Sequence, residues 1–182
     1  MTILVAYASK HGATRGVAER IAERLQALGY EAEALPVDTV SNLNAYDAVV
    51  LGSAIYYGSW MKEATEFLLR HQAVLTTRPV WLFSSGPLGV EAKGAEEQPR
   101  ELAEFQDTIH PRGHQLFFGA LDHEKLSFPE RMVIKAVRAP EGDYRDWVAI
   151  DAWAGNIAQD LSPQGHEAAT QPAPDIMPPP GV

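Results

Sequence analysis

Apolar segments of strand length alternate with amphipathic helical segments along most of this chain, and this alternation restricts the possible folds more than any other feature. Strands are expected at residues 3–8, 31–37, 46–54, 79–86 and 115–121. Helices are expected at residues 14–28, 61–71, 95–109 and 147–161. Strands that alternate with helices predict an α/β domain with a parallel sheet and right-handed crossovers.

The predicted sheet indicates where a ligand would bind. Five strands favour a doubly wound order, 2-1-3-4-5, with the strand at 31–37 on an edge because it contains Pro36. Ligands of such sheets bind outside the carboxyl ends of the strands, where the order reverses. The three segments that follow the first, third and fourth strands should therefore form one site. They are SKHGAT (9–14), GSAIYYGSW (52–60) and SSGPLG (84–89).

The first of these segments places small and hydroxylated residues at the start of a helix. A helix N-terminus has unpaired N–H groups and a partial positive charge, so it attracts anions. Gly12 lets an anion approach the backbone, and the Ser9 and Thr14 hydroxyls can add donors. The segment predicts a phosphate site. A helix that is simply capped by a hydroxyl side chain is the plain alternative.

Other phosphate-related motifs do not occur in the sequence. A P-loop needs GxxxxGK[ST], and neither that motif nor GxGxxG is present. A response regulator needs acidic residues after the first strand and a phospho-acceptor Asp after the third, where this chain has Ser9-Lys10 and Ser53-Ala54. A mononucleotide fits the remaining pattern best.

The other two segments suggest a flat ring beside the phosphate. Tyr56, Tyr57 and Trp60 offer aromatic faces at the end of a buried strand, and Gly58 lets the backbone turn. The segment at 84–89 could supply backbone N–H groups to the polar edge of a ring. Each aromatic residue taken alone could equally be an ordinary core or surface residue.

Composition excludes several kinds of chemistry. The chain has no cysteine, which excludes disulfides, thiolate nucleophiles and cysteine-ligated clusters, and its six histidines form no HExxH motif, so no metal site is predicted. A net charge of −9 argues against nucleic-acid binding. The N-terminus does not resemble a signal peptide and no apolar run has transmembrane length, so we expect a cytoplasmic protein with at most peripheral contact at the inner face of the membrane.

Two C-terminal segments lie outside the minimal pattern. Residues 123–145 form an insert before the last helix, in which residues 128–138 should be helical. Arg131, Lys135 and Arg138 would form a basic stripe there, suited to an anionic partner or simply solvated. Residues 162–182 contain six of the thirteen prolines and are expected to be a disordered tail after a domain at 1–161.

At these residues the sequence resembles the flavodoxin-like FMN proteins. Residues 9–14 are similar to the flavodoxin phosphate loop, with His11 and Ala13 where that loop usually has Thr and often Asn. "YDAVVLGSAIYYGSW…ATEFLLRH" and "FFGALDHEKLSFPERMVIKAVRAPEGDYRDW" resemble the bacterial menaquinone-dependent protoporphyrinogen oxidases, a flavodoxin-like branch. The likeness spans residues 2–161.

The resemblance implies a role for each loop. The FMN phosphate would be held by Ser9, His11, Gly12, Ala13 and Thr14. The flavin ring would contact Ala54, Ile55, Tyr56, Tyr57 and Gly58, with Tyr57 stacking on it, and its polar edge would contact Ser84, Ser85, Gly86, Pro87 and Leu88. No catalytic side chain is expected, because the flavin carries the chemistry.

Two functions remain open at this point. One is an FMN enzyme that oxidises a porphyrinogen-like substrate and reduces a quinone, as the branch resemblance implies. The other is a flavodoxin-type electron carrier between partner proteins, which the acidic charge favours because carriers dock on basic partners. A binding module with a decayed flavin site is a third possibility, allowed by His11 and Ala13.

Overall fold

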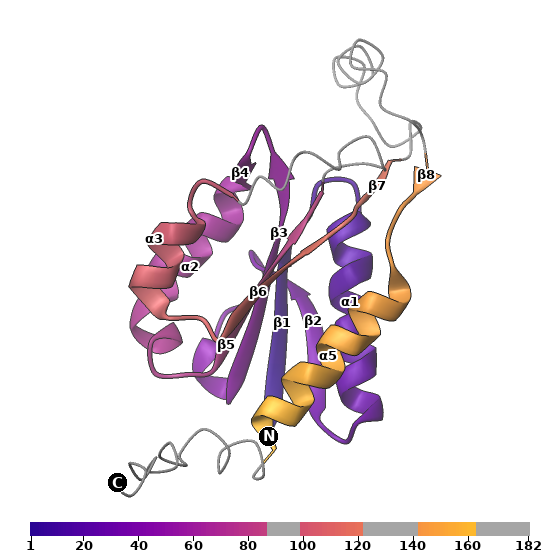
Figure 1. Cartoon of the computed structure of the whole chain (residues 1–182). Coiled ribbons are helices and arrows are strands. Elements are labelled where there is room, and N and C mark those ends of the chain that lie inside the picture. Colours follow the sequence, from indigo (N-terminus) through magenta and orange to yellow (C-terminus); the bar gives the residue numbers. More distant parts are fainter. Residues whose placement is uncertain (87–98, 122–141, 163–182) are drawn as a thin grey trace, which may run out of the picture.

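The computed structural model describes residues 1–86, 99–121 and 142–162 (Figure 1). The strands are β1 (Thr2–Ala8), β2 (Glu31–Pro36), β3 (Ala48–Tyr56), β4 (Ser59–Trp60), β5 (Val80–Ser85), β6 (Gly113–Phe117), β7 (Ala120–Leu121) and β8 (Gly142–Asp143). The helices are α1 (Ala13–Ala27), α2 (Lys62–Leu75), α3 (Leu102–Ile109) and α5 (Trp147–Leu161), with a 3-10 turn, η1 (Leu43–Ala45).

The parallel strands of the main sheet run in the order β2-β1-β3-β5-β6. The short β4 pairs only with β3, in a hairpin, and is not one of the parallel strands. When the parallel strands alone are numbered, the order is the predicted 2-1-3-4-5. The predicted α/β class and doubly wound order are therefore confirmed. β2, which ends at Pro36, is an edge strand, as expected for a strand that contains proline.

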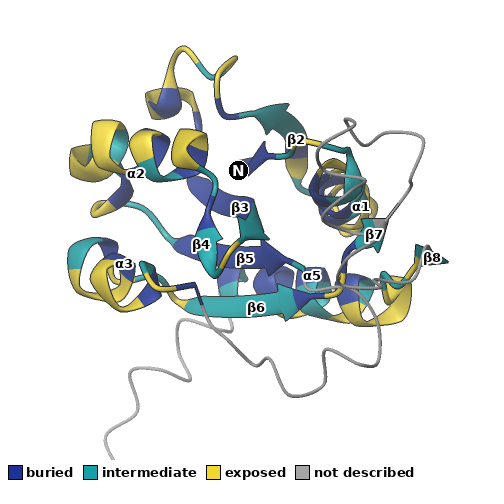
Figure 2. Cartoon of the chain, turned by 90° about the horizontal axis from the view of Figure 1, so that it is seen from above, coloured by how far each residue is buried: buried dark blue, intermediate teal, exposed yellow. Residues whose placement is uncertain are grey.

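Helices cover both faces of the sheet, with α1 and α5 on one face and α2 and α3 on the other (Figures 1 and 2). Successive side chains of β1 point to opposite faces, as the strand period requires. Ile3 and Val5 pack with α1 and α5, whereas Leu4 and Ala6 pack with α2 and α3. Because both faces are covered, the central strands are continuous apolar runs.

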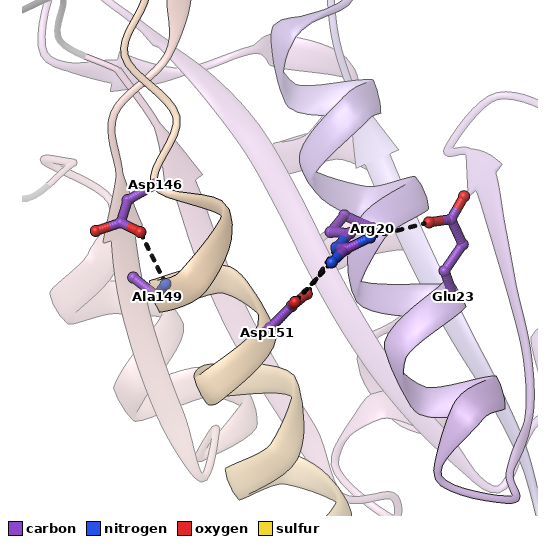
Figure 3. Close-up of polar contacts among 5 residues, drawn as sticks. All are labelled: Arg20, Glu23, Asp146, Ala149 and Asp151. Carbon is purple, nitrogen blue, oxygen red and sulfur yellow. Dashed lines mark hydrogen bonds and ion pairs between the residues drawn. The ribbon is translucent and has the colours of Figure 1, made fainter.

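An ion pair between partly buried side chains joins α1 to α5 (Figure 3). Arg20 donates from Nε to Asp151 Oδ1 at 2.7 Å and from Nη2 to Asp151 Oδ2 at 2.6 Å. The hydrogen bonds from Arg20 lower the pKa of Asp151. At the start of α5, Asp146 caps the helix by accepting from the N–H of Ala149 at 3.0 Å. These contacts fix the beginning of α5 relative to α1.

Three predictions fall wholly or largely outside the described residues. They are the helix at 128–138 with Arg131, Lys135 and Arg138, the tail after residue 162, and the loop residues Pro87 and Leu88. Of the insert, the structure describes only its end, where β8 pairs with β7 in an antiparallel ribbon. In the part of the chain that is described, no helix is long and apolar enough to cross a membrane.

Candidate functional site

The strand register brings the three predicted loops together at one edge of the sheet. Ala8, the last residue of β1, is paired with Ser53 of β3, and Ser53 is paired with Ser84 of β5. All three strands run parallel, so the segments that follow them leave from the same edge. The structure thus places the predicted phosphate loop, the aromatic segment and the described start of the third segment (Ser84–Gly86) side by side.

The turn between β1 and α1 has the geometry of an anion-binding loop. Gly12 has φ of +90°, a left-handed conformation that favours glycine. Its N–H donates to Ser9 Oγ at 3.1 Å, so the proton of the Ser9 hydroxyl is left to donate elsewhere. The turn therefore combines a left-handed glycine with a hydroxyl donor.

The N-terminus of α1 also suits an anion electrostatically. Its N-cap is Gly12, which provides no side-chain hydrogen bond, and its first turn has no acidic residue. Among the α-helices that the structure describes, the others either carry an acidic residue in the first turn (α2, α3) or are capped by a carboxylate (α5). The first N–H groups of α1 are therefore available to a phosphate.

A pocket of about 860 Å³ opens beside this turn. Its lining consists of Tyr7, Ala8, Ser9, Lys10, His11, Gly12, Arg15, Gly16, Glu19, Pro36, Val37, Asp38, Met61, Glu63 and Arg145. Burial first, and then repulsion from Glu19, raises the pKa of the Tyr7 phenol above its ordinary value, which already keeps the hydroxyl protonated at neutral pH.

Of the five residues predicted to hold the phosphate, three line this pocket. They are Ser9, His11 and Gly12. Ala13 is the first residue of α1, and the side chain of Thr14 is turned into the protein, with 1% of the residue exposed. A phosphate contact from Ala13 or Thr14 would therefore come from its backbone N–H more readily than from its side chain.

The aromatic segment forms a tight hairpin that the sequence did not predict. β3 continues to Tyr56 and pairs antiparallel with β4, which leaves Tyr57 and Gly58 as a two-residue turn. Both residues have positive φ, +53° and +78°, the requirement of a type I′ turn. Tyr57 is 86% exposed at the tip, and the N–H of Arg100 donates to Gly58 O at 3.1 Å. An exposed tyrosine ring at this edge can stack on a planar ligand.

Trp60 points inward rather than toward a ligand. Its ring contacts Phe105 with centroids 5.1 Å apart, and its indole N–H donates to Ser84 Oγ at 2.8 Å. Ser84 Oγ also lies 2.8 Å from His114 Nε2. Ser84 is fully buried and Ser85 nearly so, and the two hydrogen bonds of Ser84 hold the start of the third loop against Trp60 and His114.

Gly86, the last described residue of the third loop, is hydrogen-bonded to the sheet. Gly86 donates its N–H to Phe117 O at 3.0 Å, and a Cβ at Gly86 would lie 3.7 Å from Ile55 O. Ala54 and Ile55 continue β3 beside it. Contact of these residues with a cofactor ring stays a prediction, since only their position at the shared edge is described.

Protonation of His114 should make the fold less stable in acid. Burial lowers the pKa of His114 below 6.5, whereas the unfolded side chain keeps its ordinary value. The unfolded chain therefore binds more protons below pH 6.5, and the free energy of unfolding falls as the pH drops through this range. Urea unfolding at pH 7.5 and 5.5 measures this effect. For one proton, the free energy of unfolding should decline by at most about 1.4 kcal/mol per pH unit.

The variant H114Q separates this effect from other titrations. It removes the imidazole, so its loss of stability from pH 7.5 to 5.5 should be smaller than in the wild type. Some decline should persist, because burial, followed by repulsion from Arg70, also lowers the pKa of His71. An identical decline in both proteins would contradict the assignment to His114.

A doubly wound sheet with an anion-binding turn after its first strand and an aromatic hairpin after its third defines a mononucleotide-binding protein of the α/β class. Residues 4–147 match the Flavodoxin domain family, and the chain belongs to that family. This membership implies FMN as the cofactor, and the chain is a flavodoxin-like FMN-binding redox protein.

Individual relatives are distant. Protoporphyrinogen IX dehydrogenase [quinone] of Escherichia coli (strain K12) is 24% identical over 172 residues, which cover 87% of this chain and 95% of the relative. Oxidised flavodoxin 1 from Bacillus cereus has a TM-score of 0.57 at 12% identity, covering 89% of this chain and 100% of that one. Rubredoxin oxygen:oxidoreductase from Desulfovibrio gigas has a TM-score of 0.61 at 14% identity, over 88% of this chain but only 36% of that one.

Several pocket residues were not predicted from the sequence. Pro36 ends the edge strand β2 and is followed by Val37 and Asp38, Met61 and Glu63 lie at the start of α2, and Arg145 comes from the far end of the chain. The predicted topology could have indicated Pro36–Asp38, and Met61 with Glu63, because the loops after β2 and β4 leave near the same edge as those after β1 and β3. Nothing in the local sequence around Arg145 indicates its approach to α1.

Proposed function

We propose that this protein is an FMN-dependent oxidoreductase that oxidises a porphyrinogen-like substrate and passes the electrons to a quinone. One observation carries the proposal: the likeness to the E. coli protoporphyrinogen IX dehydrogenase [quinone] extends over 95% of that protein. It is a likeness of whole chains and not of a single motif.

The geometry of the site supports an exchange of electrons with a molecule that approaches from outside. FMN, when bound, supplies the electron-transfer chemistry, while the protein binds and orients it. The α1 turn would anchor the phosphate from one side, and the hairpin with Tyr57 is exposed at the same edge of the sheet. A planar substrate could reach a ring held at this edge without a buried tunnel.

The test is a visible spectrum of the FMN-loaded protein under anaerobic conditions. Adding protoporphyrinogen should bleach the bound flavin, and a menaquinone analogue should then restore its colour. A bound flavin that does not respond to the porphyrinogen would overturn the enzymatic proposal while leaving FMN binding intact.

The acidic charge supports a second candidate, a flavodoxin-type electron carrier. The chain has a net charge of −9, and an acidic surface favours docking on basic redox partners. In this case the bound flavin would exchange electrons with a partner protein at a rate that falls with added salt, and would ignore the porphyrinogen.

The basic residues of the insert provide a separate prediction about partners. Arg131, Lys135 and Arg138 lie outside the described residues, and we propose that they contact an anionic partner, either porphyrin carboxylates or the inner face of the membrane. Changing all three to Glu should weaken binding to anionic liposomes or to a porphyrin. Unchanged binding to both would contradict the proposal, and would leave a cytoplasmic protein without membrane contact as the simpler account.

A further inference from the structure

Arg145 reaches the predicted phosphate site from a distant part of the sequence. It immediately precedes Asp146, the N-cap of α5, yet it lines the same pocket as Ser9 and Gly12. Its side chain is only 18% exposed, which is unusual for an arginine beside an open pocket. The ion pair between Arg20 and Asp151 fixes the start of α5 beside α1 (Figure 3).

A glycine in α1 makes room for this side chain. Gly16 lies in the first turn of the helix, where its N–H donates to Gly12 O at 3.0 Å. A Cβ at Gly16 would lie 2.3 Å from Arg145 Nη1, a distance that no real Cβ contact allows. The guanidinium therefore lies directly against the first turn of α1, within one helical turn of the anion-binding loop.

Two contacts hold the guanidinium in a fixed orientation. Asp143 accepts from Nε at 2.8 Å and from Nη2 at 2.5 Å, and the ring of Trp147 lies 4.5 Å from Arg145 Cζ. These contacts engage one edge and one face of the planar group. Nη1, the nitrogen beside Gly16, is directed toward α1 and has no paired acceptor among the described residues.

The charges around the pocket indicate why a buried cation matters here. The lining includes three carboxylates, which oppose the entry of a phosphate, and three cations, which favour it: Glu19, Asp38 and Glu63, and Lys10, Arg15 and Arg145. Arg15 is paired with Glu19 at 3.4 Å and its side chain is 60% exposed, so its charge is both compensated and screened. Arg145 is also paired, with Asp143, but its side chain is only 18% exposed, so its charge is screened less.

We propose that Arg145 binds the phosphate of FMN through Nη1 and that it makes the site prefer FMN over riboflavin. The inference rests on the proposed placement of the phosphate in the α1 turn. Arg145 would then be a binding residue that belongs to the end of the insert, so that the ribbon β7–β8 connects the insert with the phosphate site. An arginine suits this role because Nε and Nη2 can hold Asp143 while Nη1 donates to the phosphate.

The test compares two ligands that differ only in the phosphate. FMN and riboflavin are titrated against the wild type and R145Q, and quenching of flavin fluorescence gives the Kd of each. A charge-assisted hydrogen bond to phosphate predicts a loss of FMN affinity of about tenfold to a hundredfold in R145Q. Riboflavin affinity should not change, and FMN affinity should depend less on salt in R145Q than in the wild type.

Two further variants control for folding. R145K keeps the positive charge but loses the planar guanidinium group with its several donors. It should bind FMN more tightly than R145Q does. R112Q is the matched control. Arg112 also lies over a tryptophan ring, with Cζ 5.4 Å from the ring centroid of Trp81, and is paired with Asp160 at 3.5 Å. Unlike Arg145, it does not line the pocket. It should leave the affinity for both ligands unchanged. Thermal unfolding of each variant confirms that the comparison is made on folded protein.

The outcomes separate this inference from the proposed site. If R145Q weakens FMN and riboflavin equally, Arg145 supports only the fold, and the inference is overturned. If R145Q binds FMN as tightly as the wild type does, the inference is also overturned while FMN binding stands. If the wild type binds riboflavin as tightly as FMN, both the inference and the proposed phosphate site fail.

Discussion

Replacing Gly52 with alanine is expected to destabilise the protein by about 2–3 kcal/mol, even though the change adds only one methyl group. Gly52 lies in the middle of β3, paired with Tyr7 of β1 and Phe83 of β5. A Cβ at this position would lie 2.0 Å from Phe83 Cζ and 2.1 Å from Phe83 Cε1. The ring of Phe83 thus occupies the space that the methyl group would need.

Phe83 cannot easily move to make that space. It is fully buried, and its ring centroid lies 6.1 Å from that of Phe117 and 6.2 Å from that of Trp153. The rings of Phe117 and Trp153 also contact each other, with centroids 5.6 Å apart. Displacing it would disturb the packing of α5 on the sheet. For a chain of this length the loss should lower Tm by about 5–10 °C, which calorimetry or thermal circular dichroism can measure.

Two variants test this explanation. The double variant Gly52→Ala/Phe83→Leu should be more stable than the sum of the two single changes predicts, because the smaller side chain admits the methyl group. Gly155→Ala in α5 is the matched control: nothing lies within 4 Å of its Cβ, and alanine should stabilise the helix by up to about 1 kcal/mol. A Gly52→Ala protein as stable as the wild type would show that the ring of Phe83 is not fixed over Gly52.

Gly58→Pro is expected to weaken FMN binding more than tenfold and to shift the redox potentials of any flavin that still binds. Proline requires φ near −65°, whereas Gly58 has φ of +78° in the hairpin turn. The turn cannot keep its shape, so Tyr57 and the end of β3 must move away from the edge of the sheet. A flavin ring that contacts this hairpin would lose its stacking surface.

Gly29→Pro provides the control for this prediction. Gly29 also has positive φ, +92°, but it follows α1 at the opposite end of the sheet. Proline there should lower the stability while leaving the affinity of the folded protein for FMN unchanged. Equal FMN affinity and equal potentials in Gly58→Pro and the wild type would contradict a position of Gly58 at the flavin.

Much of the fold could be predicted because local patterns and topology agree. Buried strands such as β1 are continuous apolar runs, and α1 has its apolar residues on one face, so period and length identify both. Given alternating strands and helices, the handedness of the crossovers leaves few possible orders. The order then places the three loops at one edge without further information.

The hairpin and the inward direction of Trp60 could not be predicted in the same way. A two-residue turn of this type usually has Asn-Gly or Asp-Gly, and here Tyr57 takes the first place with φ of +53°. The aromatic pattern predicts Trp60 at the mouth of the site, whereas in the structure it is buried against Phe105 and Ser84. These partners lie 45 and 24 positions further along the chain. Long-range contacts of this kind leave no local pattern.

The proposed phosphate site is likewise only partly predictable from the sequence. The turn at Ser9–Gly12 could be identified from residue types, because glycine and hydroxyl side chains before a helix have a known preference for anions. Arg145 could not be identified, since its place beside Gly16 depends on how α5 packs against α1. In the proposed site, a tertiary contact would supply the charge of Arg145, and the local sequence would supply the backbone donors.

The most direct test of the account is to follow the glycine amides while FMN is added. The protein labelled with 15N-glycine would be titrated with FMN, and the amide signals recorded by NMR. We expect the largest shifts at Gly12 and Gly58, with Gly29 and Gly155 unaffected because they lie away from the carboxyl edge of the sheet. Saturation with FMN that leaves Gly12 and Gly58 unmoved, or that shifts Gly29 and Gly155 instead, would contradict the placement of the cofactor at this edge.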